Sequence, residues 1–221
     1  MTQFQLAPSS LTDAMYDSVR ARIINGDIAP GEKLTEQRIA QEYGVARPTA
    51  KACIERLTAL GLLRRSARKT AVVPTLDADD ITDLFDARIM LECHAVAALA
   101  SRATVPTPAY EAHLAMHNAV ERSAFTEQVR ADIAFHMALV TGVGSERLGR
   151  MYKMIAGECH LTMGQYQAHR RTEPSSVEAE HQALLVAITA GDGDAAAQAM
   201  TLHLTRSRDR VLAQQTEQIT S

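Results

Sequence analysis

Apolar residues recur at intervals of three and four along most of the chain, and this pattern predicts a mainly α-helical protein. In the first third, the pattern predicts a helix over 11–25, a short helix after Thr35 and a third helix from Pro48 to Leu60. The segment 25–31 contains the turn-forming residues Asn, Gly, Asp and Pro, so it separates the first helix from the second.

A change of pattern follows the third helix and predicts a small β-hairpin. Strands are expected at 62–63 and 71–73, on either side of the basic segment 64–70. Three helices followed by a hairpin make up a winged helix-turn-helix, the third helix of which enters the major groove of DNA. Pro74 and the acidic residues after it mark a boundary, so we expect a DNA-binding domain at 1–74.

The second domain, 75–221, has only helical patterns, broken at Pro and Gly residues. Short connections between successive helices favour an antiparallel all-α helical bundle. The expected helices are 79–102, 107–122, 125–141, 145–170, 174–190 and 193–216.

Composition supports an ordinary globular protein, with 46% hydrophobic and 22% charged residues. We find no run of about 18 apolar residues, so no membrane helix is expected. The three cysteines lack a CxxC spacing, which is typical of free thiols in a reducing compartment. These features predict a cytoplasmic protein.

The net charge of −3 conceals an asymmetry between the two domains. Residues 1–74 hold 11 basic and 7 acidic side chains, whereas residues 75–221 hold 12 and 19. Seven of the basic residues fall within 47–69, which contains one acidic residue. Such a block indicates a surface for a polyanion, although a solvated charged face would have the same composition.

The basic residues coincide with the DNA-contacting parts of a winged helix-turn-helix, which indicates binding to double-stranded DNA. At the start of the third helix, Arg47 can form a bidentate contact with a guanine edge, and Lys51 can reach a guanine or a phosphate. Thr49 lies between them, and Arg68 and Lys69 are expected on the wing. The alternative is a small three-helix domain whose basic residues only keep it in solution.

Four residues of the second domain predict a metal site. Asp132 and His136 are spaced i, i+4 on an inward-facing helix stripe, where an unpartnered carboxylate is costly. His181 and His203 each lie 11 residues from the turn centre at 192, so they face each other at one height. Three imidazoles and a carboxylate suit zinc, nickel or another divalent first-row metal. Ordinary core histidines are the alternative.

Two further features remain open from the residues alone. Arg88 can clamp the carboxylate of a small effector, or it can form a helix ion pair with Glu92. His113 and His117 also share a helix face, but without a carboxylate at ligand spacing they are interpreted as ordinary helix residues.

A metal-dependent hydrolase is a rival function, since the same ligands could activate water. No general-base Glu is apparent beside the four predicted metal ligands, however.

The first domain closely resembles that of GntR regulators. The run 26–36 matches G-x-I-x-P-G-x-x-L-x-E, and 43–47 begins the motif G-V-S-R-x-P-V-R-E-A-L. The resemblance implies that Arg47 and Lys51 occupy the two basic recognition positions. Arg38 stands beside the position of a family arginine in the second helix, so it joins the expected DNA contacts. The chain departs from the motif in its inverted Pro-Thr order at 48–49.

The second domain resembles the FCD ligand-binding domain, which follows the GntR domain in the fatty-acid-regulator branch. Arg88-x-x-x-Glu92 and the four predicted metal ligands carry this resemblance. It implies a divalent cation held by one Asp and three His, and a small organic acid as effector. Six helices place the chain nearer the vanillate-regulator subgroup.

The expected function is an effector-responsive transcription regulator, not an enzyme. A homodimer is expected, because two recognition helices match a palindromic operator. Direct sensing of the metal is an alternative to sensing an organic acid.

Overall fold

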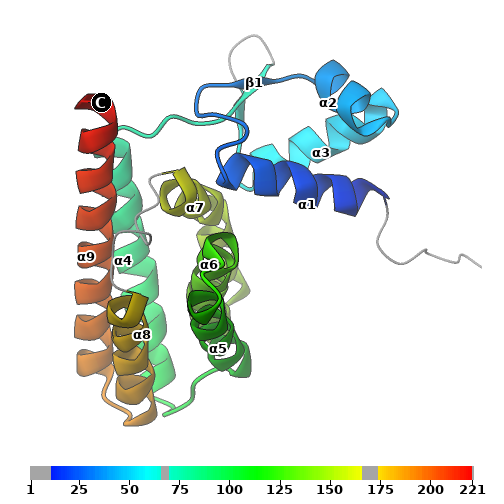
Figure 1. Ribbon diagram of the computed structural model, residues 1–221. Helices are drawn as coiled ribbons and strands as arrows, with labels where there is room; N and C mark the ends of the chain where they lie inside the picture. The colour runs from blue at the N-terminus through cyan, green and yellow to red at the C-terminus, as the bar shows by residue number, and fades with distance from the viewer. Residues whose placement is uncertain (1–10, 66–69, 166–173, 221) are drawn as a thin grey trace, which may run out of the picture. The chain divides into compact units, whose positions relative to one another are not determined.

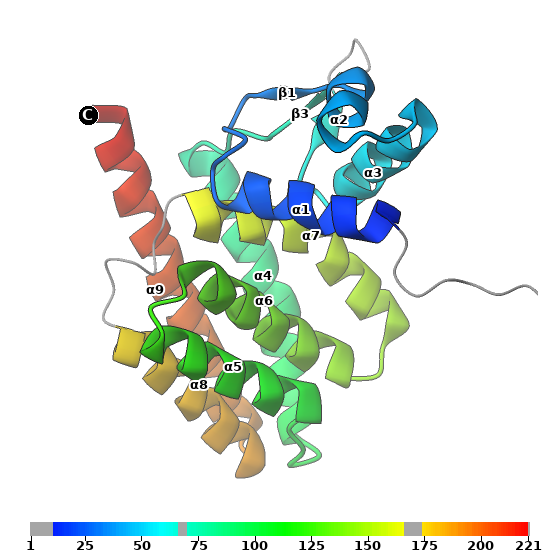
Figure 2. The ribbon, with the colours of Figure 1, turned by 45° about the vertical axis from the view of Figure 1, so that its right-hand side comes forward.

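The computed structural model describes residues 11–65, 70–165 and 174–220 of the chain. It consists of two compact units, Met1–Thr75 and Leu76–Ser221, and each is described by itself. The expected fold class is confirmed: a helix-turn-helix unit with a small sheet precedes an all-helical unit (Figures 1 and 2).

Over the residues of unit 1 that the structure describes, there are three helices and a three-stranded antiparallel sheet of order β1-β3-β2. The elements are α1 (Leu11–Ile24), β1 (Lys33–Leu34), α2 (Glu36–Tyr43), α3 (Arg47–Ala59), β2 (Arg64–Arg65) and β3 (Ala71–Val72). The sequence pattern did not predict β1. It placed the first strand of the hairpin at 62–63, two residues before β2 begins. Leu62 and Leu63 are core residues that precede the paired segment, since each is 1% exposed.

Local capping fixes the helix-turn-helix. The Thr35 side chain accepts a hydrogen bond from the backbone N–H of Arg38 and so caps α2. Gly44 ends α2 in the left-handed conformation, which glycine adopts without a Cβ clash. Pro48 lies in the first turn of α3, where its missing N–H costs little. These caps set the turn that presents the start of α3.

Unit 2 consists of six helices within its described residues, as expected. They are α4 (Ala78–Ala100), α5 (Thr107–Glu121), α6 (Phe125–Gly142), α7 (Glu146–Gln165), α8 (Pro174–Thr189) and α9 (Gly193–Thr220). The long helices α4 and α9 lie side by side, with α8 packed against α9 and α5 against α6 (Figure 1). The end expected for α7 at 170 lies outside the described residues, and α9 extends beyond the expected 216.

The core of this bundle is mostly apolar. Phe85, Leu99, Val129 and Leu184 are at most 1% exposed. A second group of buried side chains is charged or polar, although such groups are costly to remove from water unless they are paired. They are Arg88, Glu92, Gln128, Asp132, His136, His160, Thr162, His181, His203, Ser207 and Gln215.

We predict that Gly142→Ala destabilises the bundle. A Cβ at position 142 would lie 2.1 Å from Cγ of Pro106, so the chain must shift to accommodate it. Overpacking of this kind costs about 1–3 kcal/mol. Gly149→Ala is the matched control, because its Cβ would lie 3.5 Å from Cγ2 of Thr141, an ordinary contact. Thermal denaturation of both variants tests this, and equal melting temperatures would contradict it.

Candidate metal centre and nucleic-acid interface

The structure brings the four predicted metal ligands together inside unit 2. Asp132 and His136 come from α6, His181 from α8 and His203 from α9. One ligand atom from each side chain lies within 4.8 Å of the others, and all four side chains are buried. The equal distance of the two histidines from the α8–α9 turn corresponds to ring centroids only 4.8 Å apart.

Two of the separations between ligand atoms match those around a single ion, and a third is slightly longer. Nε2 of His203 lies 3.2 Å from Nε2 of His136, and Nε2 of His181 lies 3.4 Å from Oδ1 of Asp132. Nε2 of His136 lies 4.0 Å from that same oxygen. Donor atoms bonded to one metal at about 2.0–2.2 Å stand roughly 3–3.5 Å apart. Small side-chain adjustments would therefore close a coordination sphere.

The other nitrogens of two histidine rings are held by carboxylates. Nδ1 of His136 donates to Oε2 of Glu92 at 2.5 Å, and Nδ1 of His203 donates to Oε2 of Glu180 at 2.8 Å. With the proton on Nδ1, each neutral ring presents a bare Nε2 to the centre of the cluster. This is the arrangement of histidine ligands whose other nitrogen is hydrogen-bonded outside the metal site.

The surroundings of Glu92 and Glu180 favour their ionised form, and those of His181 and His203 favour neutral rings. Burial alone would raise the pKa of Glu92, but Arg88 and His136 lower it to about 2. The pKa of Glu180 is likewise lowered to about 2, against the effect of burial, by His203 and Arg210. Burial lowers the pKa of His203, and it lowers that of His181 well below the usual value. Neutral imidazoles are the form that binds metals.

These residues fit a divalent cation. Two Nε2 atoms 3.2 Å apart share either a proton or a metal ion, and a carboxylate oxygen lies beside them. Within the described residues, neither ring nitrogen of His181 has a hydrogen-bond partner, although the ring is fully buried. An unsatisfied polar atom in a core calls for an explanation, and an ion bound at Nε2 supplies one.

Arg88 lies in the core next to the cluster. The sequence left two roles open for it, a clamp for an effector carboxylate and a helix ion pair with Glu92. Its Nε donates to Oε1 of Glu92 at 2.8 Å, and both side chains are at most 2% exposed. The hydroxyl of Tyr152 donates to that oxygen at 3.0 Å. The helix ion pair is therefore formed, and its carboxylate joins Arg88 directly to the ring of His136.

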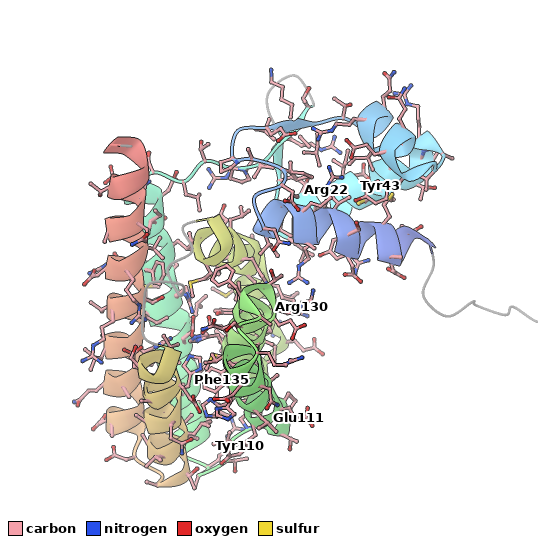
Figure 3. All side chains as sticks on the ribbon, viewed as in Figure 1. Arg22, Tyr43, Tyr110, Glu111, Arg130 and Phe135 are labelled. Atoms are coloured by element: carbon pink, nitrogen blue, oxygen red, sulfur yellow. The ribbon has the colours of Figure 1, made fainter. Side chains whose placement is uncertain are left out.

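The neighbouring histidines of α5 play different parts. His117 lies 2.9 Å from Oε1 of Glu178. His113 lies nearer the cluster than the sequence indicated, with its ring centroid 6.1 Å from that of His181. Phe135, labelled in Figure 3, stacks on the His181 ring at 4.2 Å, and its centroid lies 6.1 Å from that of His113. Neither α5 histidine belongs to the group of potential ligands among the described residues.

Sequence reasoning missed Glu180 as a functional residue. It gathers His203, Arg206 and Arg210 from α9, at distances of 2.8, 3.2 and 3.5 Å. A signal was present, because positions 203, 206 and 210 share one face of α9 and carry basic or imidazole groups. Such a face indicates a carboxylate on the helix packed against it.

In unit 1, the predicted base-reading residues lie on the outer face of α3. The Arg47 side chain is 71% exposed and only 3.9 Å from a carboxylate oxygen of Glu36, a loose pair. Lys51 is 54% exposed and pairs with Glu55 one turn later, while Thr49 is half-buried. The face therefore offers two cations at the start of the helix, with long side chains that are open to solvent.

The remaining expected DNA contacts have different surroundings. Arg38 donates from a terminal nitrogen to Glu32 at 2.5 Å and from Nε to Glu42 at 2.7 Å. A phosphate contact by Arg38 would therefore use its second terminal nitrogen. Arg68 and Lys69 lie outside the described residues. Arg65 of β2 is 39% exposed and lies 3.6 Å from Glu55.

Family comparisons agree with this division of the chain. Residues 11–73 match the gntR family of bacterial regulatory proteins, and residues 83–206 match the FCD domain. The chain belongs to the GntR family, in the branch that carries an FCD domain. Unit 1 thus contains the GntR DNA-binding domain, and unit 2 the FCD domain.

Individual relatives cover nearly the whole chain. The Bacillus subtilis HTH-type transcriptional regulator YdhC is 26% identical over 92% of both chains. An Escherichia coli protein whose name refers to the L-lactate dehydrogenase operon is 27% identical over 89% of this chain and 84% of its own. A solved GntR-type regulator from Rhodococcus sp. RHA1 has a TM-score of 0.78 and 26% identity, over 93% of this chain and 99% of its own.

These comparisons identify a DNA-binding transcription regulator. The matched families and relatives are regulators, which confirms the expectation that the chain is not an enzyme and removes the hydrolase alternative. Across the part of the chain that the structure describes, no helix is long and apolar enough to span a bilayer.

We predict that Arg88→Met strongly destabilises unit 2. Removing one partner of a buried ion pair leaves the other charge uncompensated, which costs about 3–5 kcal/mol. Arg150→Met is the control, because Arg150 is 65% exposed and pairs with a 92% exposed Glu146. Such surface pairs contribute little. Denaturant unfolding of both variants measures the difference, and a mild effect of Arg88→Met would show that Glu92 is not charged in the core.

Proposed function

We propose that this regulator binds a palindromic operator as a homodimer and responds to a small carboxylic acid bound in a metal-containing FCD domain. The metal centre consists of Asp132, His136, His181 and His203, with zinc or nickel as the preferred ion. The observation that carries the proposal is the convergence of Nε2 of His136 and His203 beside the Asp132 carboxylate, while their Nδ1 atoms are engaged elsewhere.

The proposed operator contacts use α3 and the wing. Arg47 and Lys51 project from the start of α3, which is the base-reading end of a recognition helix. Arg38, Arg68 and Lys69 complete the set as phosphate or minor-groove contacts. Two copies of the chain would present two such helices to the two halves of a palindrome, which supports the homodimer.

Arg88 is the proposed second anchor for the effector. Glu92 joins its guanidinium to His136, so an acid that binds the metal would lie close to Arg88. The Nε of Arg88 already donates to Glu92, so the carboxylate of the effector would bind the terminal nitrogens of Arg88. The name of the Escherichia coli relative refers to an enzyme of lactate, a small carboxylic acid, which supports this class of effector.

Direct metal sensing remains the second candidate. The metal ligands come from three helices, so binding and loss of the ion would change how those helices are held together. Operator affinity measured with and without metal, in the absence of organic acids, separates the two candidates. A large change assigns the signal to the metal, and a change only on adding an acid assigns it to the effector.

We predict one divalent metal per protomer, lost on His181→Ala or His203→Ala. A ligand that binds only the folded state stabilises it, so metal removal should also lower the melting temperature. Elemental analysis and thermal denaturation with and without chelator test this. His94→Ala is the control, because His94 is exposed on α4 and outside the cluster. A wild-type protein without metal, or equal metal loss in the control, would show that the site is misassigned.

We predict that Arg47→Ala weakens specific operator binding by about 1–3 kcal/mol, the value of one bidentate guanine contact. The fold should persist, because Arg47 is 71% exposed. A gel-shift series over salt concentration checks the assignment. A base contact lowers affinity for the operator more than for unrelated DNA, whereas loss of a phosphate contact lowers both alike and flattens the salt dependence. Unchanged operator affinity would remove Arg47 from the interface.

A further inference from the structure

The geometry points to Glu180 and Glu92 as positioning residues of the metal centre, which hold the His203 and His136 rings with Nε2 turned toward the ion. This inference rests on the proposed metal centre and adds two residues outside its ligand set. Neither carboxylate lies on the same helix as the histidine that it holds. Glu92 on α4 faces α6, and Glu180 on α8 faces α9.

Each carboxylate fixes both the position and the tautomer of a ring. An ionised carboxylate only accepts hydrogen bonds, so Nδ1 of the neutral ring carries the proton, and Nε2 is free to donate its lone pair. The negative charge also raises the basicity of the ligand nitrogen, which strengthens its bond to a cation. The His181 ring has no such carboxylate within the described residues, and stacking on Phe135 orients it instead.

Glu180 has a framework of its own that keeps it in place. Arg206 and Arg210, one turn apart on α9, both contact its carboxylate, and the Glu180 side chain is only 11% exposed. Its neighbour in sequence, His181, is a proposed ligand. Helix α8 thus supplies one ligand and the acceptor that orients another, so a single helix positions two of the three imidazoles.

Glu180 gives the cleaner test of the two carboxylates. Glu92 also holds Arg88 and Tyr152 in the core, so its substitution disturbs the fold as well as the ring of His136. Loss of Glu180 leaves Arg206 and Arg210 with access to solvent, because they are 53% and 20% exposed. Glu178 is the matched control. It lies on the same helix and holds His117, a histidine outside the cluster, at 2.9 Å.

The experiment measures the Zn²⁺ affinity of the full-length chain by competition with a chromophoric chelator. The variants are Glu180→Ala, Glu180→Gln and Glu178→Ala. We expect a 10- to 100-fold loss, the range that such partners typically contribute, for Glu180→Ala. Glu180→Gln should lose less, because its amide oxygen still accepts from Nδ1 but carries no charge. Glu178→Ala should bind as the wild type does.

Two further readouts separate positioning from a merely structural role. The melting temperature in excess chelator reports the stability of the metal-free fold. Glu180→Ala should lower this melting temperature by less than it lowers the melting temperature of the Zn²⁺-loaded protein. The visible spectrum of the Co²⁺-loaded protein reports the ligand field, and it should change in Glu180→Ala but not in Glu178→Ala. If Glu180→Ala does not fold, Glu180→Gln decides the question by the same measurements.

Each outcome bears on a distinct claim. Wild-type Zn²⁺ affinity in a folded Glu180→Ala variant overturns the positioning role and leaves the metal centre intact. An equal loss of affinity in Glu178→Ala also overturns it, because the effect would then be general to α8. A wild-type chain that binds no Zn²⁺ contradicts the proposed metal centre itself, and the positioning role with it.

Discussion

Unit 2 depends on how charged and polar side chains are paired in the middle of a helical bundle. Asp132, Glu92 and Arg88 lie where water cannot solvate them, together with three imidazoles. Each carboxylate and imidazole there would be costly alone. Glu92 resolves part of this cost by accepting from Arg88, Tyr152 and His136 at once. A cation bound at the Nε2 atoms would offset the remaining cost of burying the imidazoles and the Asp132 carboxylate. The metal and the buried polar groups would then stabilise one another.

The same pairing joins helices that are distant in the sequence. Contacts within the cluster link α4 to α6 through Glu92 and His136, and α8 to α9 through Glu180 and His203. On α9, Gln215 donates to the backbone oxygen of Leu76, the first residue of unit 2. Helix α9 therefore holds both a histidine of the cluster and the first residue of unit 2.

Much of the fold and of the candidate site follows from sequence pattern. Inward stripes at helical spacing were sufficient to place Asp132 and His136 on one face, and the turn at 192 was sufficient to set His181 opposite His203. The pattern could not predict contacts that depend on tertiary packing.

The features that the pattern missed are short or depend on neighbouring helices. The two-residue strand β1 is too short to have a periodicity, and Leu62 and Leu63 were assigned to a strand because core residues and strand residues are both apolar. Glu180 was missed because its role depends on which residues of α9 lie opposite it, and the ion pairs of Arg38 depend on the packing around α2.

The central claim is that one divalent ion holds this cluster together. The most direct test is a crystal structure with diffraction data collected on both sides of the absorption edge of the metal found in the purified protein. The account predicts one anomalous peak per protomer, about 2.0–2.2 Å from Nε2 of His136, His181 and His203 and from the Asp132 carboxylate. Absence of a peak there, with the rings hydrogen-bonded to one another in the metal-supplemented protein, would contradict it.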